Sequence, residues 1–366
     1  MKKVVFLTTV LLLAVSLVAC STVKPSAPSS QPGPQGSGTS PGGKQEVVVA
    51  GYGGSFEKEF KEKVIPEFEK KYNASVKYIT GVSTDTLAKL QAQKDNPQID
   101  VAIMDDGPQA QAKVLGLLDK LDPVQVPNLV NVYEMTKDKD NVGVAIGVVA
   151  TGLAYNKKAF DEKKWAAPAS WNDLADPKYM GKMVLPSITN TYGVHLLVMV
   201  ARANGGGEAN IEPGFAKMKE IAKNTITFDK TADVSNFFLQ GDAIISAWGS
   251  GRVYTLAAKN FPIAFVFPKE GTPALLPMAS PVKKAPHPEL AQKFINFLLD
   301  EMAQKAIAQA VFFGPVNKTV KLSPELAAQV VYSDDQINKL TKMDWVSINA
   351  KRAEWTERWA KEIESK

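Results

Sequence analysis

The sequence has one cysteine, Cys20, and only two histidines, His195 and His287, among 366 residues. A single cysteine cannot form an internal disulfide. Neither histidine belongs to an HExxH motif or lies near a second residue with metal-ligand spacing, and no GxSxG motif or phosphate-binding P-loop occurs. These absences argue against an enzyme, so we expect no catalytic residues, no metal and no cofactor.

The net charge is also small once the N-terminus is set aside. The chain carries a net charge of +5, but Lys2, Lys3, Lys24 and Lys44 all precede the first acid, Glu46. The remainder is therefore close to neutral, at about +1, and it contains no basic cluster with interleaved aromatic residues. We expect a monomeric protein with no nucleic-acid partner.

The N-terminus has the features of an export signal. Lys2 and Lys3 precede an apolar run, residues 4–19, which is shorter than the roughly 20 residues that span a bilayer. The run ends in Leu17-Val18-Ala19-Cys20, which resembles a bacterial lipobox. This resemblance implies a lipoprotein signal peptide at residues 1–19 and a lipidated Cys20. The alternative is an ordinary secretory signal with an incidental cysteine.

Residues 20–45 are rich in Ser, Pro and Gly, and such a segment buries too little apolar surface to offset the entropy of ordering it. We predict a flexible tether with a reach on the order of 25–30 Å. Together with lipidation of Cys20, this predicts an extracytoplasmic protein anchored to the bacterial cell membrane.

Beyond the tether, short apolar segments alternate with helical patterns, which is typical of an α/β fold. In the first helix an apolar side chain recurs every four residues, at Phe56, Phe60, Val64, Phe68 and Tyr72. Ser55 is predicted to cap this helix, and Pro66 to kink or divide it. The predicted strands are residues 46–50, 75–80, 99–104, 142–150, 152–155, 183–185, 243–247 and 263–267.

Several segments, taken in order, resemble the solute-binding proteins of ABC importers, in particular the polyamine (spermidine/putrescine) branch of the type II periplasmic binding fold. They are residues 64–69 (VIPEFE), 151–156 (TGLAYN), 241–243 (GDA), 248–251 (WGSG), 268–271 (PKEG), 291–299 (AQKFINFLL) and 314–317 (GPVN). The resemblance implies two α/β lobes joined by crossing hinge segments. It also implies two partners, a membrane permease and an ATPase. By analogy, residues 46–154 with 275–321 form lobe 1, and residues 155–274 with 322–366 form lobe 2.

Ligands of open α/β sheets bind beyond the carboxyl ends of strands, where loops expose backbone N–H groups and helix N-termini. Turns of this kind, each of which also has a purely structural interpretation as a cap, loop or core residue, supply most of the candidates. The predicted ligand-binding residues are Tyr52, Gly53, Gly54, Ser55, Asp105, Asp106, Thr151, Ser187, Thr191, Tyr192, Trp248, Ser250, Arg252 and Glu270. Trp345 is a weaker candidate.

The chain departs from the polyamine branch where ammonium groups would bind. After Gly271 the branch usually carries a Trp and an Asp, but this chain reads TPALLP, and residues 185–193 contain no acid. Burying an ammonium without a carboxylate costs several kcal/mol. We therefore expect a small zwitterion or an organic acid rather than a long polyamine. The alternatives are an iron or metal-chelate binder and a surface lipoprotein without a transport role.

Overall fold

The computed structural model describes residues 44–365. The predicted signal peptide, Cys20 and nearly all of the predicted tether lie outside these described residues. Within the described part of the chain, no helix combines the length and the apolar character needed to cross a membrane.

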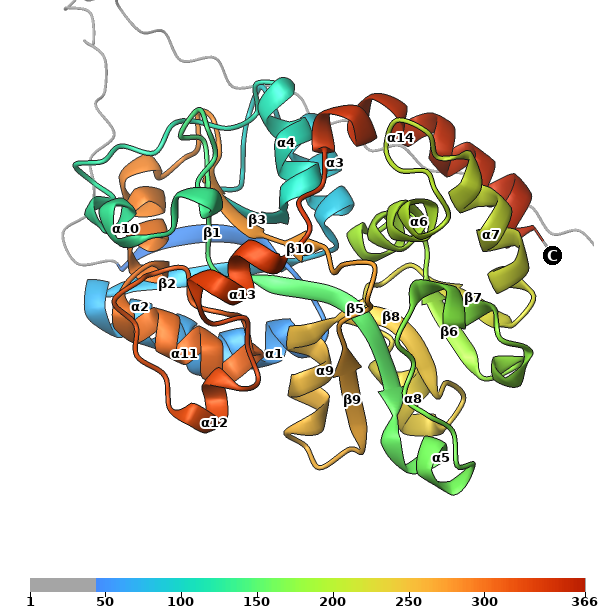
Figure 1. The fold of residues 1–366 in the computed structure, drawn as a ribbon. Coiled ribbons are helices and arrows are strands. Elements are labelled where there is room, and N and C mark those ends of the chain that lie inside the picture. Colours follow the sequence, from blue (N-terminus) through green and yellow to red (C-terminus); the bar gives the residue numbers. More distant parts are fainter. Residues whose placement is uncertain (1–43, 366) are drawn as a thin grey trace, which may run out of the picture. The chain divides into compact units, whose positions relative to one another are not determined.

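A five-stranded mixed sheet organises the first lobe, in the order β2-β1-β3-β11-β4 (Figure 1). Its strands are β1 (Gln45–Gly51), β2 (Ala74–Thr80), β3 (Val101–Asp105), β4 (Val144–Ala145) and β11 (Pro277–Pro281). The first three are parallel, and β11 runs antiparallel to both β3 and β4.

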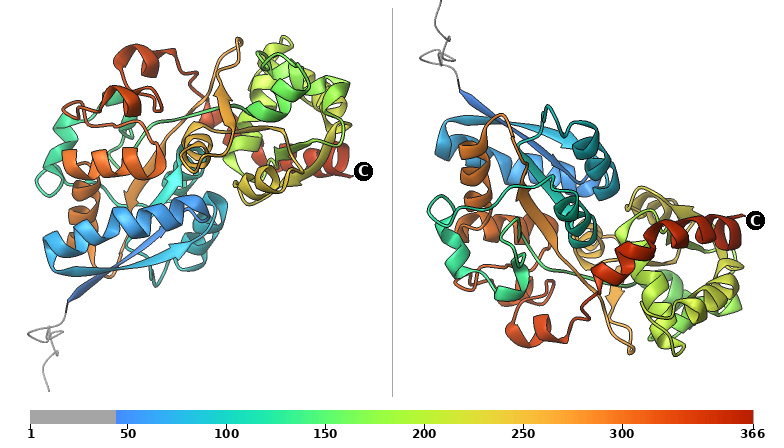
Figure 2. Two further views of the ribbon diagram at one scale, coloured as in Figure 1. Left: turned by 90° about the horizontal axis from the view of Figure 1, so that it is seen from below. Right: turned by 90° about the horizontal axis from the view of Figure 1, so that it is seen from above.

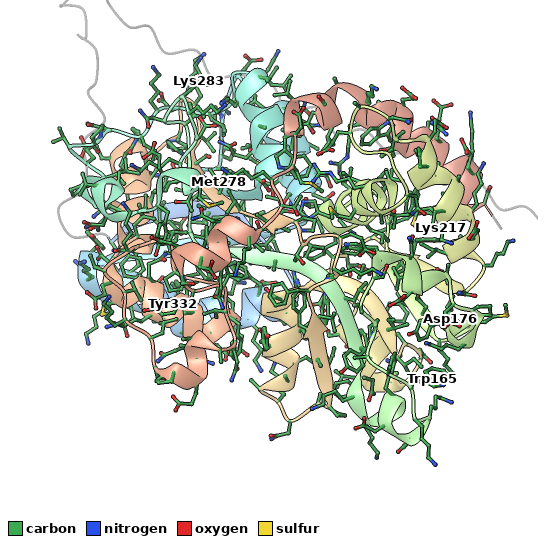
Figure 3. All side chains as sticks on the ribbon, viewed as in Figure 1. Trp165, Asp176, Lys217, Met278, Lys283 and Tyr332 are labelled. Carbon is green, nitrogen blue, oxygen red and sulfur yellow. The ribbon has the colours of Figure 1, made fainter. Side chains whose placement is uncertain are left out.

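Alternating side chains of β1 show how both faces of this sheet are covered, because successive residues of a strand point to opposite faces. Val47 and Val49 belong to an apolar cluster with α1, α2, α10 and α11, whereas Val48 and Ala50 pack with α3 and α4. These helices are α1 (Ser55–Lys63), α2 (Ile65–Tyr72), α3 (Ser83–Ala92), α4 (Asp106–Val114), α10 (Pro288–Leu298) and α11 (Glu301–Val311). Met278 of β11 is buried, whereas Lys283 beyond its end is exposed (Figure 3).

A second mixed sheet organises the other lobe, in the order β10-β5-β8-β6-β7, with β9 also pairing with β5. Its strands are β5 (Val149–Asn156), β6 (Met183–Pro186), β7 (Thr225–Asp229), β8 (Ile245–Gly249), β9 (Ile263–Val266) and β10 (Ala274–Leu275). Leu153 packs in a cluster with α6, α7 and α14, whereas its neighbour Ala154 belongs to the cluster that contains α8 and α9. These helices are α6 (Thr191–Ala203), α7 (Glu212–Ala222), α8 (Ser235–Gln240), α9 (Ser250–Ala257) and α14 (Trp345–Trp359). The same lobe also contains the short helix α5 (Lys157–Glu162).

The order of the strands along the chain shows two places where the chain passes from one sheet to the other. It leaves the five-stranded sheet after β4 and enters the second sheet at β5, and it returns between β10 and β11. Figures 1 and 2 show the two lobes side by side, with β5 running from one toward the other. The two-lobed α/β fold predicted from the sequence is therefore confirmed, while the exact lobe boundaries stay a prediction.

The C-terminal part is helical. α12 (Pro324–Ala327) and α13 (Asp334–Lys339) precede α14, which continues into a π-helical turn, Ala360–Glu364. Trp355 and Trp359 of α14 are fully buried against α6 and α7. Short 3-10 helices lie in the connections, at Pro127–Asn131, Glu134–Thr136, Trp171–Ala175 and Pro177–Tyr179.

Two local predictions need correction, and one is confirmed. Pro66 does divide the first helical region, because α1 ends at Lys63 and α2 begins at Ile65. Ser55, however, is the first residue of α1 rather than its cap, which is Gly54. The predicted strands 142–150 and 152–155 are instead a two-residue β4 and a continuous β5, because the chain changes sheets between them.

Candidate ligand-binding site

A cavity with an empty volume of about 650 Å³, part of it open to solvent, lies where the carboxyl ends of strands from both sheets meet. The turns after β1, β2 and β7 contribute to its wall, as do the last residue of β3 and the first turns of α6 and α9. This is the position at which α/β sheets bind ligands. Its lining residues are Tyr52, Gly53, Ser55, Phe56, Gly81, Val82, Ser83, Thr84, Asp105, Asn190, Thr191, Tyr192, Thr231, Ala232, Arg252, Thr255, Leu275, Val311 and Phe313.

Asp105, at the end of β3, supplies a carboxylate to the cavity. The Tyr52 hydroxyl donates a hydrogen bond to Asp105 Oδ1 over 2.6 Å, and the Asp105 amide donates to Ser83 Oγ over 3.0 Å. Burial raises the pKa of Asp105 above its usual value, although surrounding hydrogen bonds oppose the rise. Burial and the neighbouring Asp105 raise the pKa of Tyr52 well above its usual value, so its phenol remains a donor at neutral pH.

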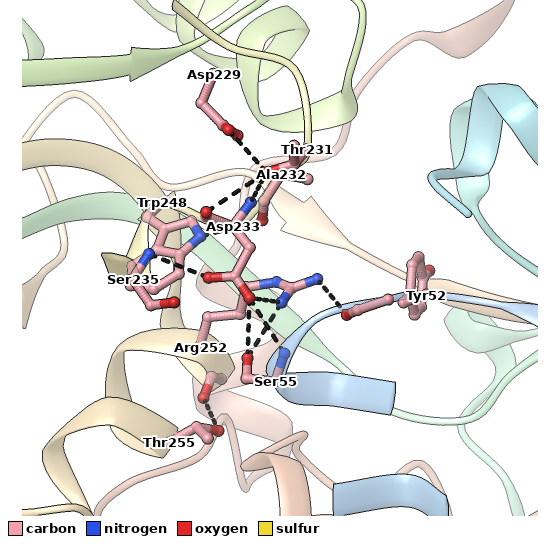
Figure 4. Close-up of polar contacts among 12 residues, drawn as sticks. Tyr52, Ser55, Asp229, Thr231, Ala232, Asp233, Ser235, Trp248, Arg252 and Thr255 are labelled. Carbon is pink, nitrogen blue, oxygen red and sulfur yellow. Dashed lines mark hydrogen bonds and ion pairs between the residues drawn. The ribbon is translucent and has the colours of Figure 1, made fainter. Parts of the chain in front are cut away.

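Arg252, near the start of α9, supplies a guanidinium from the other lobe (Figure 4). Its Nη1 lies 2.8 Å from Asp233 Oδ2, and the two side chains are 11% and 13% exposed. Burial opposes ionisation of Asp233, but Arg252 and hydrogen bonds from Ser235 and Ser55 lower its pKa below the usual value. The pair is therefore charged at neutral pH, and it lies at the edge of the cavity.

Neutral polar groups line the side of the cavity formed by α6. Asn190 caps this helix, its side-chain oxygen accepting from the Gly193 amide over 3.2 Å. Thr191 and Tyr192 follow in the first turn, and burial raises the pKa of Tyr192 to about 12. Because a helix N-terminus carries partial positive charge, α3 and α6 both present a favourable end to an anionic group.

An outer groove with an empty volume of about 1690 Å³ adjoins the cavity and shares part of its lining, including Gly53, Ser55 and Thr84. Three lysines lie along it, accompanied by Asp85 and Asp233: they are Lys58, Lys230 and Lys259. Lys259 also lies 3.5 Å from Glu59, so the charges along this groove nearly balance.

The structure brings seven of the predicted ligand-binding residues together in the cavity wall: Tyr52, Gly53, Ser55, Asp105, Thr191, Tyr192 and Arg252. Gly54 adjoins them in the outer groove. Their contact with a ligand stays a prediction.

The other predicted residues lie outside the wall of this cavity and contact protein groups. Asp106 accepts a hydrogen bond from Trp345 Nε1 over 2.5 Å, and Thr151 Oγ1 lies 2.8 Å from His195 Nδ1. Ser187 donates to Glu364 over 2.7 Å. Their roles as ligand contacts also stay predictions.

The same holds for three further predicted residues of the second lobe. Trp248 is buried against Phe238 and donates from Nε1 to the Ala232 carbonyl over 3.3 Å. The Ser250 hydroxyl accepts from the Ala150 amide over 3.1 Å. Glu270 accepts from the Ser170 hydroxyl and the Trp171 amide.

Sequence reasoning missed several groups at the site, of which Asp233 matters most. It lies four residues after the end of β7 (TITFD), a strand that was not among those predicted from the sequence, although its polar and apolar residues alternate as in a strand. Ser83 and Thr84 were missed for a different reason: they begin helix α3, and such residues occur at helix ends with or without a ligand nearby.

Comparison with known proteins identifies the family. The profile of the bacterial extracellular solute-binding proteins matches residues 63–333. The chain belongs to this family. The solute-binding protein is 25% identical over 286 residues to the spermidine/putrescine-binding periplasmic protein of Escherichia coli, an alignment that covers 75% of this chain and 81% of the relative. It is also 25% identical over 298 residues to the gamma-aminobutyric acid-binding protein of Pseudomonas aeruginosa, covering 78% and 82%.

Solved structures agree with the fold. An ABC transporter protein from Clostridium perfringens superposes on the solute-binding protein with a TM-score of 0.68 and 25% identity, covering 87% of this chain and 99% of the other. The predicted resemblance to the polyamine-type branch is thus confirmed, as is the assignment to solute-binding transport proteins rather than enzymes. Within the described residues, no group of three His, Cys, Asp or Glu side chains is arranged to hold a metal ion.

Proposed function

We propose that this chain is the lipid-anchored binding component of an ABC importer and that it captures a small organic solute carrying a carboxylate, either a zwitterion or an organic acid. The two lobes close on the solute, and the protein delivers it to a membrane permease that an ATPase drives. The observation that carries the proposal is that Asp105 and Arg252, from different lobes, line one cavity.

The balance of charge in the cavity favours this ligand class. Arg252 and the N-termini of α3 and α6 suit a carboxylate, because guanidinium groups and helix N-termini both stabilise anions. Asp105 suits an ammonium group at the other end of a zwitterion. Among the described residues that line the cavity it is the one acid, which disfavours a polyamine with several buried ammonium groups.

The relatives support the same range of ligands. By name, one binds the diamine putrescine and the triamine spermidine, and another binds gamma-aminobutyric acid, which has an ammonium and a carboxylate. A cavity with one acid and one guanidinium fits the second kind of molecule better than the first.

Titration calorimetry on the purified full chain tests the proposal, with gamma-aminobutyric acid, glutarate, putrescine and spermidine as probes. We expect gamma-aminobutyric acid or glutarate to bind more tightly than either polyamine. Changing Arg252 to Lys should weaken binding of the carboxylate probes at least tenfold, since Lys cannot form the bidentate contact. Tight binding of putrescine or spermidine with no response to the carboxylates would overturn the proposed ligand class.

A further inference from the structure

The Asp233 carboxylate lies where an anionic ligand group would find its donors (Figure 4). It accepts from the Ser55 amide over 3.2 Å and from the Ser55 hydroxyl over 3.3 Å, and its Oδ2 lies 2.8 Å from Arg252 Nη1. Backbone amide, hydroxyl and guanidinium donors therefore converge on one carboxylate oxygen. A donor set of this kind selects carboxylates or other small oxyanions.

These contacts join the two lobes. Ser55 begins α1, which follows β1 of the five-stranded sheet, whereas Asp233 follows β7 and Arg252 follows β8 in the second sheet. Arg252 also reaches the first lobe directly, donating from Nη1 to Ser55 Oγ over 3.2 Å and from Nη2 to the Gly53 carbonyl over 3.5 Å. Because both charged side chains are nearly buried, solvent ions screen the pair weakly.

Gly54 gives the carboxylate room to reach α1. Its backbone has a φ of 68°, a conformation that favours glycine, and a Cβ at this position would collide with Asp233 Oδ2. The same Cβ would lie 3.4 Å from Arg252 Nη1. The chain thus has a glycine at the position where a side chain would push the carboxylate off the helix.

We propose that Asp233 is an internal substitute for the anionic group of the ligand. In the unliganded protein its carboxylate bridges Arg252 and Ser55 and holds the lobes together, and a ligand carboxylate displaces it. The displacement rests on the proposed function, because it requires a ligand that carries a carboxylate. The bridge itself does not depend on the identity of the ligand.

Distance measurements in the absence of ligand test the bridge. Spin labels at Lys70→Cys and Ala216→Cys, exposed positions on α2 and α7, report the separation of the lobes by pulsed electron resonance. The full chain carries Cys20→Ala so that only the introduced thiols are labelled. Asp233→Asn keeps the side-chain shape but removes the charge, and Asp242→Asn removes a charge from an exposed residue of the same lobe.

We expect Asp233→Asn to shift the distance distribution toward longer separations, with Asp242→Asn unchanged from the parent. Ser55→Ala, which removes one of the bridging donors, should shift it in the same direction but less. Identical distributions in Asp233→Asn and Asp242→Asn would overturn the proposal, provided that circular dichroism shows both variants folded.

Calorimetry tests the displacement. Removing the internal competitor should tighten binding of gamma-aminobutyric acid by about tenfold in Asp233→Asn relative to Asp242→Asn, with putrescine affected less because it has no carboxylate. Unchanged or weaker binding of gamma-aminobutyric acid would overturn the displacement. If no carboxylate probe binds any variant, the proposed ligand class fails, and the distance measurement still decides whether Asp233 holds the lobes together.

Discussion

Asp105 and Asp106 are neighbours in the chain but lie in different environments. Asp105 faces the cavity and accepts from the Tyr52 hydroxyl, whereas Asp106 accepts from Trp345 at the start of α14. Both were predicted from the sequence as ligand-binding residues. Choosing between them required the position of Trp345, which is more than two hundred residues away in the chain.

At the residue scale, Asp105→Asn should weaken binding of an ammonium-bearing ligand such as gamma-aminobutyric acid by about tenfold or more, because a buried ammonium would lose its counter-charge. Glutarate, which lacks an ammonium, should lose much less. Calorimetry on the full chain measures both. Asp95→Asn, an exposed acid of the same lobe, serves as the matched control, and an equal loss in that variant would contradict the assignment.

Asp106 offers a pH-dependent prediction at the same scale. Burial and, to a lesser degree, the nearby Asp105 raise the pKa of Asp106 to about 7. The pKa of Asp106 is therefore higher in the folded protein than in the unfolded chain, so a protonated Asp106 favours the folded state. This contribution to the free energy of unfolding is full at low pH and is lost as the pH rises toward 7. Asp106→Asn mimics the protonated form and keeps an acceptor for Trp345.

We therefore expect Asp106→Asn to raise the melting temperature at pH 8 by a few degrees, on the order of the 2–4 °C that 1 kcal/mol produces in a domain of about 200 residues. At pH 4 the variant and the parent should melt at the same temperature. Thermal unfolding followed by circular dichroism measures both values. A larger gain at pH 4 than at pH 8 would contradict the raised pKa.

At the element scale, the contact between α4 and α14 depends on a close approach that only a small residue permits. A Cβ at Gly107 would lie 2.6 Å from the nearest ring carbon of Trp345. The contact also includes Asn349, which donates to the Gly107 carbonyl over 3.1 Å and accepts from Gln111 over 3.0 Å. Hydrophobic periodicity carries no information about which helices pack against each other.

Gly107→Ala should destabilise the protein by about 1–3 kcal/mol, the usual cost of forcing extra volume into a packed contact. Urea unfolding of the full chain measures the change in the free energy of unfolding. Combining Gly107→Ala with Trp345→Leu should recover part of the loss, since the smaller side chain makes room for the new methyl group. Fully additive losses in the double variant would show that the two side chains do not collide.

At the scale of the whole molecule, the two lobes meet around the cavity, and one apolar cluster extends over both sheets, from Val47 of β1 to Trp248 of β8. The proposed hinge motion would open and close the two lobes around this cavity. In Asp233→Asn, which lacks the proposed bridge, a hinged binding protein should compact when a small solute binds. A surface lipoprotein without a transport role should not compact, and small-angle scattering can detect the difference.

The proposed membrane anchor is a separate prediction at this scale. Cys20→Ala should move the protein from the membrane fraction to the soluble fraction and abolish incorporation of labelled fatty acid, because no thiol remains to be acylated. Ligand affinity should not change, since the residues that line the cavity all lie within residues 44–365. Ser21→Ala is the control for local change. Continued membrane attachment of Cys20→Ala would contradict a lipid anchor at this residue.

The sequence by itself determined the α/β class and the division of the first helical region at Pro66, and it pointed to some of the turns that line the cavity, including those at Tyr52 and Tyr192. These features depend on local periodicity and on turn residues, which act within a few positions along the chain. The tertiary structure alone decided that Asp105 rather than Asp106 lines the cavity, and that Asp233 joins Arg252 to the start of α1. The pairing of Ser55 with Asp233 spans 178 residues, and no local pattern specifies a contact that exists only when two lobes come together.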